Sequence, residues 1–513
     1  MKVFTESLFT LPEVELADDF LSYPALVVGI FEGKVSDSEF LQKIKAKKKV
    51  DIIKALQRRN FTGKEKQVFS FDLSEEQKVI FVGLGREDAQ EWEKKENIRR
   101  ASGNGVVLAR DSGYEEVCLC GFEGYEREAL EAAFLGLYRF KKYKISDSEE
   151  DGDEKTDDEK LEKEVKKIFI YTQRKKDEVK NIIDFTRVIC EAQNFARDIV
   201  NEPGNVINPL TLSEIASALA EKYGLGCEIF DIEEIKKMGM GGVIAVGQGS
   251  SIPPKVVHIW WKPSGKPKDK IAFIGKAITF DSGGLSLKPQ NSMVTMKLDK
   301  AGACAVLGAM KSIAILKPQV EVHGLFAACE NMPSGTAQRP DDIIKIFDGK
   351  TVEVINTDAE GRLTLADMLA FAGRLGVSKI VDLATLTGAC MVALGEFTAG
   401  LMGNSEKFNE FIFKLARDLG EKVWILPLDK DLEEKLKSDF AFIKNVGDGY
   451  GGAITAAIFL SKFVPKGVEW AHLDIAGPAF LNKKLGYFTA KGGTGFGVRT
   501  LVELTRKIEN GEY

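Results

Sequence analysis

The chain has 513 residues, of which 44% are hydrophobic and 29% charged, and its formal net charge is −6. At about 150 residues per domain this length predicts two to four domains, large enough to fold without disulfides or a structural metal. The negative charge argues against a broad nucleic-acid-binding face. No stretch of 18 apolar residues occurs, so we expect no membrane span.

The seven cysteines are odd in number and form no Cys-x-x-Cys pair. We therefore predict buried, reduced thiols in a cytoplasmic protein rather than a disulfide framework. The early acidic residues Glu6, Glu13 and Glu15 do not fit an N-terminal secretory signal.

Residues 1–175 predict a small N-terminal α/β domain. Short apolar runs predict strands at 25–31, 67–71, 78–83, 106–109, 116–121 and 167–171, and a helix is expected at 126–141. No acids, histidines and lysines occur at catalytic spacing here, so we assign no chemistry to this domain. Residues 147–164 hold 11 acids and 3 lysines, which predicts a solvated acidic insert.

One long helix is predicted over residues 176–200, because apolar side chains recur near the 3.6-residue period until Asn201-Glu202-Pro203-Gly204 ends the pattern. We interpret this helix as a connector that opens a larger α/β catalytic domain spanning 176–513.

The second half alternates predicted strands and helices. Strands are expected at 256–260, 270–275, 320–329, 351–355, 379–383 and 470–475, and helices at 211–222, 301–315, 363–372, 453–462 and 500–508. This order predicts a mainly parallel central sheet, in which ligands bind where strands end in loops. His258, His323 and His472 lie in predicted apolar strands, so we expect structural roles for them.

Two stretches that follow predicted strands concentrate charged side chains. The first holds two lysines and two aspartates, namely Lys276, Asp281, Lys288 and Asp299. The second is Asn356-Thr357-Asp358-Ala359-Glu360-Gly361-Arg362. Asp358 and Glu360 are two residues apart, so they point the same way if the backbone is extended.

Four carboxylates buried together would repel one another unless cations held them. Oxygen ligands suit Mg²⁺, Mn²⁺ or Zn²⁺, and a pair of such ions would activate water and stabilise a developing oxyanion. The presence of only three histidines argues against a histidine-dominated zinc site. Each acid taken singly is also typical of a helix cap or turn, so spacing alone leaves both interpretations open.

The octapeptide from Asn356 to Leu363 resembles the signature of the leucyl (cytosol) aminopeptidase family of metallopeptidases. The resemblance covers roughly residues 190–505 and includes the segments 200–203, 246–250, 275–289, 330–335, 384–389 and 470–477. The chain departs from the family pattern at Lys300, where an uncharged residue is expected. Pro478 and Phe480 stand where Thr and Trp are more usual.

The resemblance implies a two-metal exopeptidase that removes N-terminal residues from peptides, with a metal-bridging water as nucleophile. The implied metal ligands are Lys276, Asp281, Asp299, Asp358 and Glu360. They would hold two divalent ions per subunit, manganese or zinc, with magnesium or cobalt as alternatives. Lys288 would polarise the scissile carbonyl, and Arg362 would hold a bicarbonate ion that acts as general base.

The resemblance also implies a substrate site. Asp299 would meet the free α-amino group, Met296 and Thr385 would line the pocket for the first side chain, and the backbone of Leu386 and Gly388 would bond the peptide. Such chemistry requires a neutral Lys276 amine, whose pKa a neighbouring dication must lower, and a charged Lys288 ammonium. Arg362 suits bidentate recognition of a planar anion.

The family further implies a homohexamer that acts on peptide substrates in peptide catabolism. One alternative is a hexameric DNA-binding regulator of the same fold, which would need a basic groove across subunits. Another is a two-metal phosphoesterase, disfavoured because neither loop has a phosphate-cradling glycine pattern and the first offers a lysine as a ligand.

Overall fold

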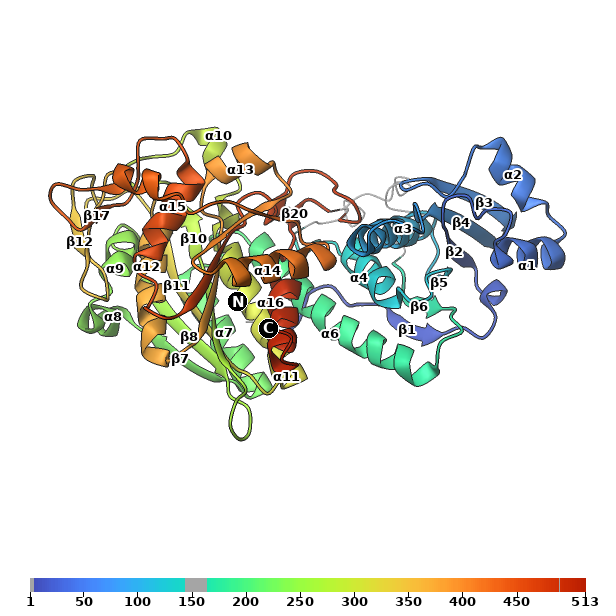
Figure 1. The fold of residues 1–513 in the computed structure, drawn as a ribbon, viewed down its shortest axis with the longest axis horizontal. Helices are drawn as coiled ribbons and strands as arrows, with labels where there is room; N and C mark the ends of the chain where they lie inside the picture. The colour runs from blue at the N-terminus through green and yellow to red at the C-terminus, as the bar shows by residue number, and fades with distance from the viewer. Residues whose placement is uncertain (1–3, 144–163, 489) are drawn as a thin grey trace, which may run out of the picture.

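Two sheets flanked by helices organise the molecule (Figure 1). The computed structural model describes residues 4–143, 164–488 and 490–513. The predicted acidic insert at 147–164 lies outside the described residues, apart from Glu164. The N-terminal sheet occupies one end of an elongated molecule, and the larger sheet occupies the other (Figure 1).

The N-terminal sheet has six strands in the order β1-β6-β5-β2-β4-β3, all parallel to their neighbours except β3 with β4. The strands are β1 (Glu13–Leu16), β2 (Ala25–Ile30), β3 (Val68–Ser74), β4 (Gln77–Gly83), β5 (Glu116–Cys120) and β6 (Lys167–Ile170). The helices are η1 (Phe20–Ser22), α1 (Glu39–Lys48), α2 (Ile52–Arg58), α3 (Glu91–Asp111) and α4 (Glu126–Leu137). One core joins the sheet to α3 and α4, and a second joins it to α1 and α2. Five of the six predicted strands are confirmed.

The strand predicted at 106–109 is wrong, because these residues lie inside α3. A run of four apolar residues is too short for its period to separate a strand from a buried helix. The glycine at 105 lets α3 approach the sheet closely, since a Cβ there would lie 2.5 Å from Cγ1 of Val27 on β2. The helix predicted at 126–141 ends earlier, at Leu137.

The predicted connector is one helix, α6 (Lys176–Asn201). Its first half, with Val179 and Ile183, belongs to the core under the N-terminal sheet. Its second half, with Phe195 and Ile199, belongs to a core of the large sheet. The helix therefore completes two cores (Figure 1).

Buried ion pairs also join the two parts of the molecule. The carboxylate of Glu131 on α4 lies 3.0 Å from Nε of Arg99 and 3.4 Å from Nη1 of Arg499, and all three side chains are almost fully buried. Burial favours the neutral form of Glu131, but Arg127 and the other two arginines outweigh it and lower its pKa to about 2. Removing one partner of such a buried set leaves an uncompensated charge, so these contacts fix the junction.

The large sheet has nine strands in the order β16-β15-β18-β14-β9-β11-β8-β7, with β10 beside β11. They are β7 (Gly226–Phe230), β8 (Lys255–Trp261), β9 (Lys270–Gly275), β10 (Ala277–Asp281), β11 (Glu321–Asn331), β14 (Lys379–Ala384), β15 (Ala399–Gly403), β16 (Val423–Ile425) and β18 (Glu469–Asp474). The central strands β11, β9, β14 and β18 are mutually parallel, which confirms the predicted mainly parallel sheet.

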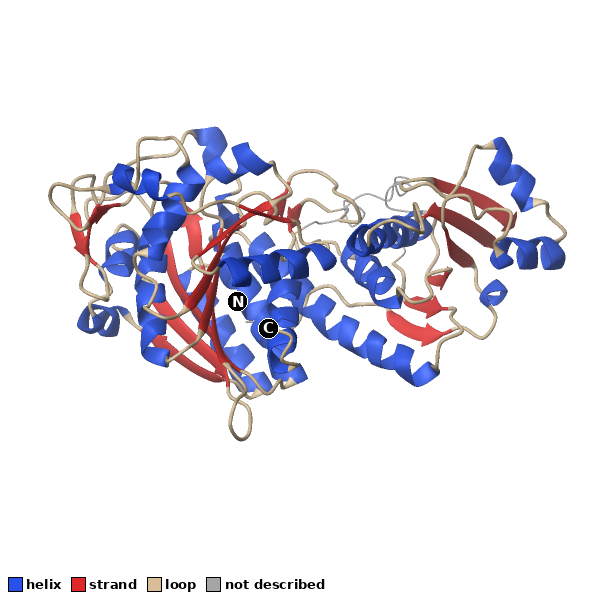
Figure 2. Cartoon of the chain, viewed as in Figure 1, coloured by secondary structure: helices blue, strands red, loops and turns tan. Residues whose placement is uncertain are grey.

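Helices cover both faces of this sheet (Figure 2). One face packs on α6, α7 (Pro209–Tyr223), α11 (Ala301–Leu316), α14 (Glu406–Asp418) and α16 (Val498–Glu509). The other packs on α8 (Ile232–Met238), α9 (Gly241–Gly247), α12 (Gly361–Ala372) and α15 (Gly452–Ser461). Shorter helices are α10 (Gln290–Met293), η3 (Met296–Lys300), η4 (Gly373–Leu375), α13 (Gly388–Leu394) and η5 (Lys430–Leu436).

The strand predicted at 351–355 differs from the structure. It is the shorter β13 (Thr351–Glu353), and it belongs to a separate sheet with β12 (Ile343–Lys345) and β17 (Ile443–Lys444). Its apolar pattern specified a strand but not the partner strand, which is remote in sequence. A further two-stranded sheet joins β19 (Phe480–Leu481) to β20 (Gly492–Gly493).

All seven cysteines are free thiols, six of them buried and Cys227 partly exposed. Across 4–143, 164–488 and 490–513, no helix combines the length and the apolar character needed to cross a bilayer.

Two of the three histidines form a hydrogen-bonded pair inside the large sheet. His258 Nε2 lies 2.9 Å from His323 Nδ1, and His323 Nε2 lies 3.1 Å from a carboxylate oxygen of Glu321. An ionised carboxylate only accepts, so His323 donates from Nε2 and its Nδ1 accepts from His258. Burial, reinforced by His258, lowers the pKa of His323 to about 4, so the ring is neutral at pH 7.

Replacing His323 with glutamine is expected to flatten the loss of stability on acidification. The unfolded ring takes up a proton near pH 6.5 but the folded one only near pH 4, so the stability it contributes is complete above pH 6.5 and is lost as the pH falls through that window. Urea midpoints measured from pH 7.5 to 4.5 should fall more steeply for the unmodified protein. Parallel curves would contradict the assignment.

Candidate metal centre

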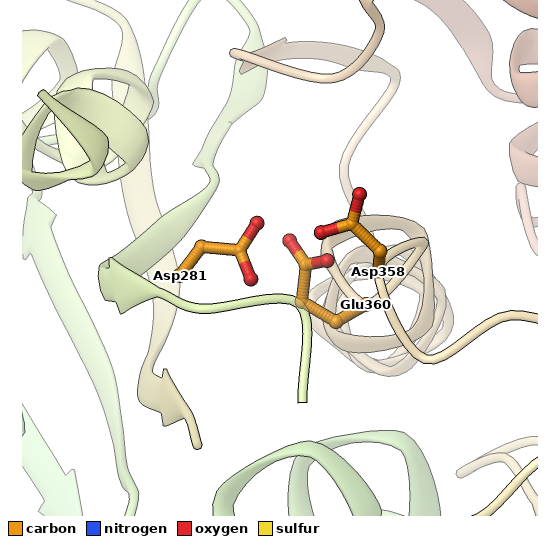
Figure 3. A group of neighbouring side chains, drawn as sticks. All are labelled: Asp281, Asp358 and Glu360. Atoms are coloured by element: carbon orange, nitrogen blue, oxygen red, sulfur yellow. The ribbon is translucent and has the colours of Figure 1, made fainter. Parts of the chain in front are cut away.

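Three acidic side chains converge at the carboxyl edge of the large sheet (Figure 3). Asp281 is the last residue of β10, while Asp358 and Glu360 lie in the turn that leads into α12. Each offers a carboxylate oxygen, and these oxygens all lie within 4.8 Å of one another. We call these three residues the carboxylate cluster.

Two lysines tie the cluster to its surroundings. Nζ of Lys276 lies 2.8 Å from Oδ1 of Asp299 and 2.9 Å from Oε1 of Glu360. Nζ of Lys288 lies 2.8 Å from Oδ2 of Asp281 and 2.6 Å from Oδ1 of Asp358. The sequence pointed to seven charged residues in the two strand-end stretches. The structure brings six of them into contact here, all except Arg362.

The backbone between Asp358 and Glu360 is not extended, contrary to prediction. The amide of Ala359 donates to the carbonyl of Asn356 in a turn, and Glu360 has the helical angles φ −78° and ψ −36°. The two carboxylates converge because α12 begins here. The next residue, Gly361, has no side chain, which lets Lys276 approach the start of α12 closely. A Cβ at this position would lie 2.4 Å from Cε of Lys276.

The remaining predicted residues surround the cluster. Arg362, in the first turn of α12, is buried, and its Nη1 donates to the carbonyl of Asn445 at 2.7 Å. The hydroxyl of Thr385 donates to Asp299 at 2.7 Å. Met296 begins η3, the short helix that carries Asp299, and Gly388 begins α13 just after Leu386.

Burial and crowding shift the ionisation of these groups. Burial, followed by the nearby charge of Asp281, raises the pKa of Glu360 to about 8, and burial also raises the pKa of Asp299. Burial disfavours the ammonium of Lys276, but Asp299 and Glu360 outweigh it, so among the protein groups alone its pKa is raised. The pKa of Lys288 is raised in the same way, with Asp281 as the largest opposing cause.

Burial lowers the pKa of Arg362 to about 10, with Glu360 and Asp474 acting in the opposite direction. The guanidinium therefore stays charged at neutral pH. In the described parts of the chain, Asn445 supplies its only hydrogen-bond acceptor. Its other N–H groups meet no acceptor among the described residues.

The donor set fits divalent cations. Four buried or half-buried carboxyl groups share two ammonium groups, so they cannot all ionise without excess negative charge, and the raised pKa of Glu360 reflects this crowding. Oε2 of Glu360 and Oδ2 of Asp299 are buried, and no donor in the described part of the chain reaches them. Buried oxygens without a partner are costly, and hard cations that prefer oxygen ligands would satisfy them. Lys276 could join such a set only as a neutral amine.

Sequence reasoning missed the residues that hold the two stretches together. Nδ2 of Asn331, at the end of β11, donates to Asp281 at 2.8 Å and to the carbonyl of Thr357 at 3.0 Å. The Thr357 hydroxyl donates to the carbonyl of Gly283 at 2.6 Å. Asn331 and Thr357 lie in segments that resemble the family, which was the only available signal. Asn445, which bonds Arg362, lies outside them.

The comparisons with known proteins agree with this geometry. The model of the Cytosol aminopeptidase family, catalytic domain, matches residues 194–502, and the N-terminal domain model of the same family matches 27–147. The predicted boundary at residues 175 and 176 lies between the two matches and stays a prediction.

Relatives match over nearly the whole chain. A probable cytosol aminopeptidase of Aquifex aeolicus (strain VF5) is 48% identical over 507 residues, which are 96% of this chain and 98% of the relative. Another, from Persephonella marina (strain DSM 14350 / EX-H1), is 47% identical over 434 residues, covering 82% of this chain and 84% of the relative.

Solved structures share the fold. A mutant of tomato leucine aminopeptidase superposes with a TM-score of 0.83 at 32% identity, covering 98% of each chain. The bottromycin maturation enzyme BotP in complex with Mn gives a TM-score of 0.81 at 30% identity, covering 95% of this chain and all of that one. From the family models and full-length relatives together, the chain belongs to the cytosol aminopeptidase family of metallo-aminopeptidases.

Proposed function

We propose that this chain is a two-metal, leucyl-type aminopeptidase that hydrolyses N-terminal residues from peptides with water as the nucleophile. The observation that carries the proposal is the carboxylate cluster beside Lys276 and Lys288, which together with Asp299 places four carboxyl groups around two ammonium groups. Family membership supports the reaction class, and the geometry supports the use of cations.

Two divalent cations would be held by Lys276, Asp281, Asp299, Asp358 and Glu360. Manganese has support from the manganese complex of the structural neighbour BotP, and zinc, magnesium and cobalt are the alternatives. When bound, such a pair of cations lowers the pKa of a water and neutralises charge that develops on the substrate carbonyl.

The side chains of this chain perform the remaining tasks. Lys288, kept charged by Asp281 and Asp358, would donate to the scissile carbonyl oxygen as it gains negative charge. Asp299 would accept from the free α-amino group of the substrate, which restricts cleavage to the N-terminus. Arg362, with unused N–H groups, would bind a bicarbonate ion that takes up the proton of the attacking water.

The substrate would lie against the loop after β14. Met296 and Thr385 would line the pocket for the first side chain, and the backbone of Leu386 and Gly388 would bond the peptide. Thr385 supports this assignment because its hydroxyl already reaches Asp299, the proposed partner of the α-amino group.

Assembly and location are part of the proposal. A cytoplasmic homohexamer is the form we infer, and exposed aromatic side chains such as Trp424, Phe440 and Tyr450 supply apolar surface for contacts between subunits. The alternative of a DNA-binding regulator gains no support from the site or from the comparisons.

Removal of metal is expected to abolish peptidase activity. The purified protein should contain about two metal ions per chain and hydrolyse leucine p-nitroanilide, lose that activity on chelation, and regain it with Mn²⁺ or Zn²⁺. An aryl phosphate assayed in parallel should not be hydrolysed. A metal-free preparation with full activity, or hydrolysis of the phosphate alone, would refute the proposal.

A further inference from the structure

We propose that Asp474 is a positioning residue of this enzyme, whose carboxylate holds the substrate-binding loop at 385–388. The inference rests on the proposed function, because the loop belongs to the proposed substrate site. Asp474 itself is fully buried and touches none of the reacting groups.

The contacts of Asp474 concentrate on this loop. Its Oδ1 accepts from the amides of Leu386 at 3.2 Å, Thr387 at 3.4 Å and Ala476 at 3.2 Å. Its Oδ2 accepts from the hydroxyl of Thr387 at 2.6 Å. Asp474 ends β18 and is paired in register with Ala384 at the end of β14, so one carboxylate ties together two neighbouring strand ends.

The loop in turn touches the candidate metal centre. Thr385 donates its hydroxyl to Asp299 at 2.7 Å, and its carbonyl accepts from Nζ of Lys276 at 3.0 Å. On the other side of the loop, the Thr387 hydroxyl caps α13 by accepting from the amide of Cys390 at 3.0 Å. A shift of residues 386 and 387 would therefore move both Thr385 and the first turn of α13.

Further buried polar contacts lie behind Asp474 on β18. Behind Asp474, Nδ1 of His472 donates to Asp382 at 2.6 Å, and Trp470 donates to the other oxygen of Asp382 at 2.6 Å. The polar side chains that precede Asp474 on β18 are thus held by Asp382 on the neighbouring strand β14.

Replacing Asp474 with asparagine distinguishes a carboxylate that holds the loop in place from one that only fills space. The amide keeps the size of the side chain and one acceptor oxygen, but it removes the charge and replaces the other acceptor with a donor. Three backbone amides and one hydroxyl then compete for a single acceptor oxygen. A carboxylate that merely filled space would tolerate this change without an effect on substrate binding.

The test compares Asp474→Asn with Asp367→Asn. Asp367 is a matched control, because it is a fully buried carboxylate that accepts from two backbone amides, Val243 and Phe347, each at 2.8 Å, away from the loop. Asp474→Asn should lower kcat/KM for leucine p-nitroanilide by about 10 to 100-fold, with a raised KM, as expected for a misplaced binding loop. Its metal content should stay equal to that of the unmodified protein.

Hydrogen exchange by mass spectrometry supplies a readout independent of activity. The segment with the amides of Leu386 and Thr387 should exchange faster in Asp474→Asn and at the original rate in Asp367→Asn. If Asp474→Asn does not fold, Thr387→Val removes the 2.6 Å contact from the other side and should raise KM and loop exchange in the same way.

The outcomes separate this inference from the proposed function. An unmodified protein without peptidase activity overturns the proposed function, and faster loop exchange in the variant would still support the hold of Asp474 on the loop. An active protein whose Asp474→Asn variant keeps KM, kcat and loop exchange unchanged overturns the inference. Equal effects in Asp367→Asn would also overturn it, since they would mark a general loss of structure.

Discussion

Replacing Glu360 with glutamine is expected to lower kcat/KM for an N-terminal leucine substrate by about 1,000-fold or more. Glu360 is buried among Asp281, Asp299 and Lys276, and one of its oxygens meets no donor in the described chain. The amide would lose the charge that a cation needs and point a donor at Lys276. Several kcal/mol of stabilisation from the cations would be lost, at a factor of ten per 1.4 kcal/mol.

The measurements are metal content per chain and turnover of leucine p-nitroanilide. Metal content should fall below two per chain, while the stripped variant should resist urea at least as well as the stripped parent, because the substitution removes the cost of burying an ionisable carboxyl group next to Asp281. Glu330→Gln is the control, since Glu330 is the residue before the end of β11 and its carboxylate accepts from the hydroxyl of Ser250 at 2.6 Å rather than joining the cluster. A Glu360→Gln protein with two metals and full turnover would refute the role.

Replacing Lys288 with methionine is expected to lower kcat by about 100 to 1,000-fold, the usual effect of removing one donor to a developing oxyanion. Methionine has a similar length and no charge. Metal content should not fall, because Asp281 and Asp358 lose a competing cation when the ammonium is removed. This combination distinguishes Lys288 from Glu360, whose replacement should reduce both quantities.

Pre-steady-state turnover and metal analysis of Lys288→Met test this expectation. Lys268→Met is the matched control, because that ammonium lies at the surface and donates to the carbonyl of Glu509. A variant that changes KM alone, with kcat retained, would assign Lys288 to substrate binding rather than to stabilisation of the oxyanion.

Most of the fold followed from periodic patterns. The 26 residues of α6 show a sustained helical period, and the buried strands β2, β4 and β5 are continuous apolar runs. The pattern failed at 106–109, where four apolar residues fit a strand or a buried helix equally. It also could not tell that β13 pairs with β17, because a strand's pattern does not name a distant partner.

The charged residues of the site were predictable because they lie at strand ends and within a specific octapeptide. The residues that hold these charged side chains in place by hydrogen bonds were not predictable. The side chain of Asn331 donates a hydrogen bond to Asp281, fifty residues away in sequence. The carbonyl of Asn445 accepts from Arg362, 83 residues away, and Asp474 accepts from the amide of Leu386, 88 residues away. An amide or a lone carboxylate in an apolar strand gives no local signal of such a partner. The turn from Asp358 to Glu360 was missed because the two-residue alternation of side chains in a strand was assumed to continue beyond the last residue of the strand.

Helix α6 belongs to the hydrophobic cores of both halves of the molecule, which couples the stability of the two halves. Residues near Val179 close one hydrophobic interior and residues near Phe195 close the other, along a single rigid rod. Fraying of either half of α6 removes packing from the adjoining core, so we expect unfolding of the two halves of the molecule to be coupled. The N-terminal half, which supplies none of the candidate site residues, would thereby contribute to the stability of the half that holds the candidate metal centre.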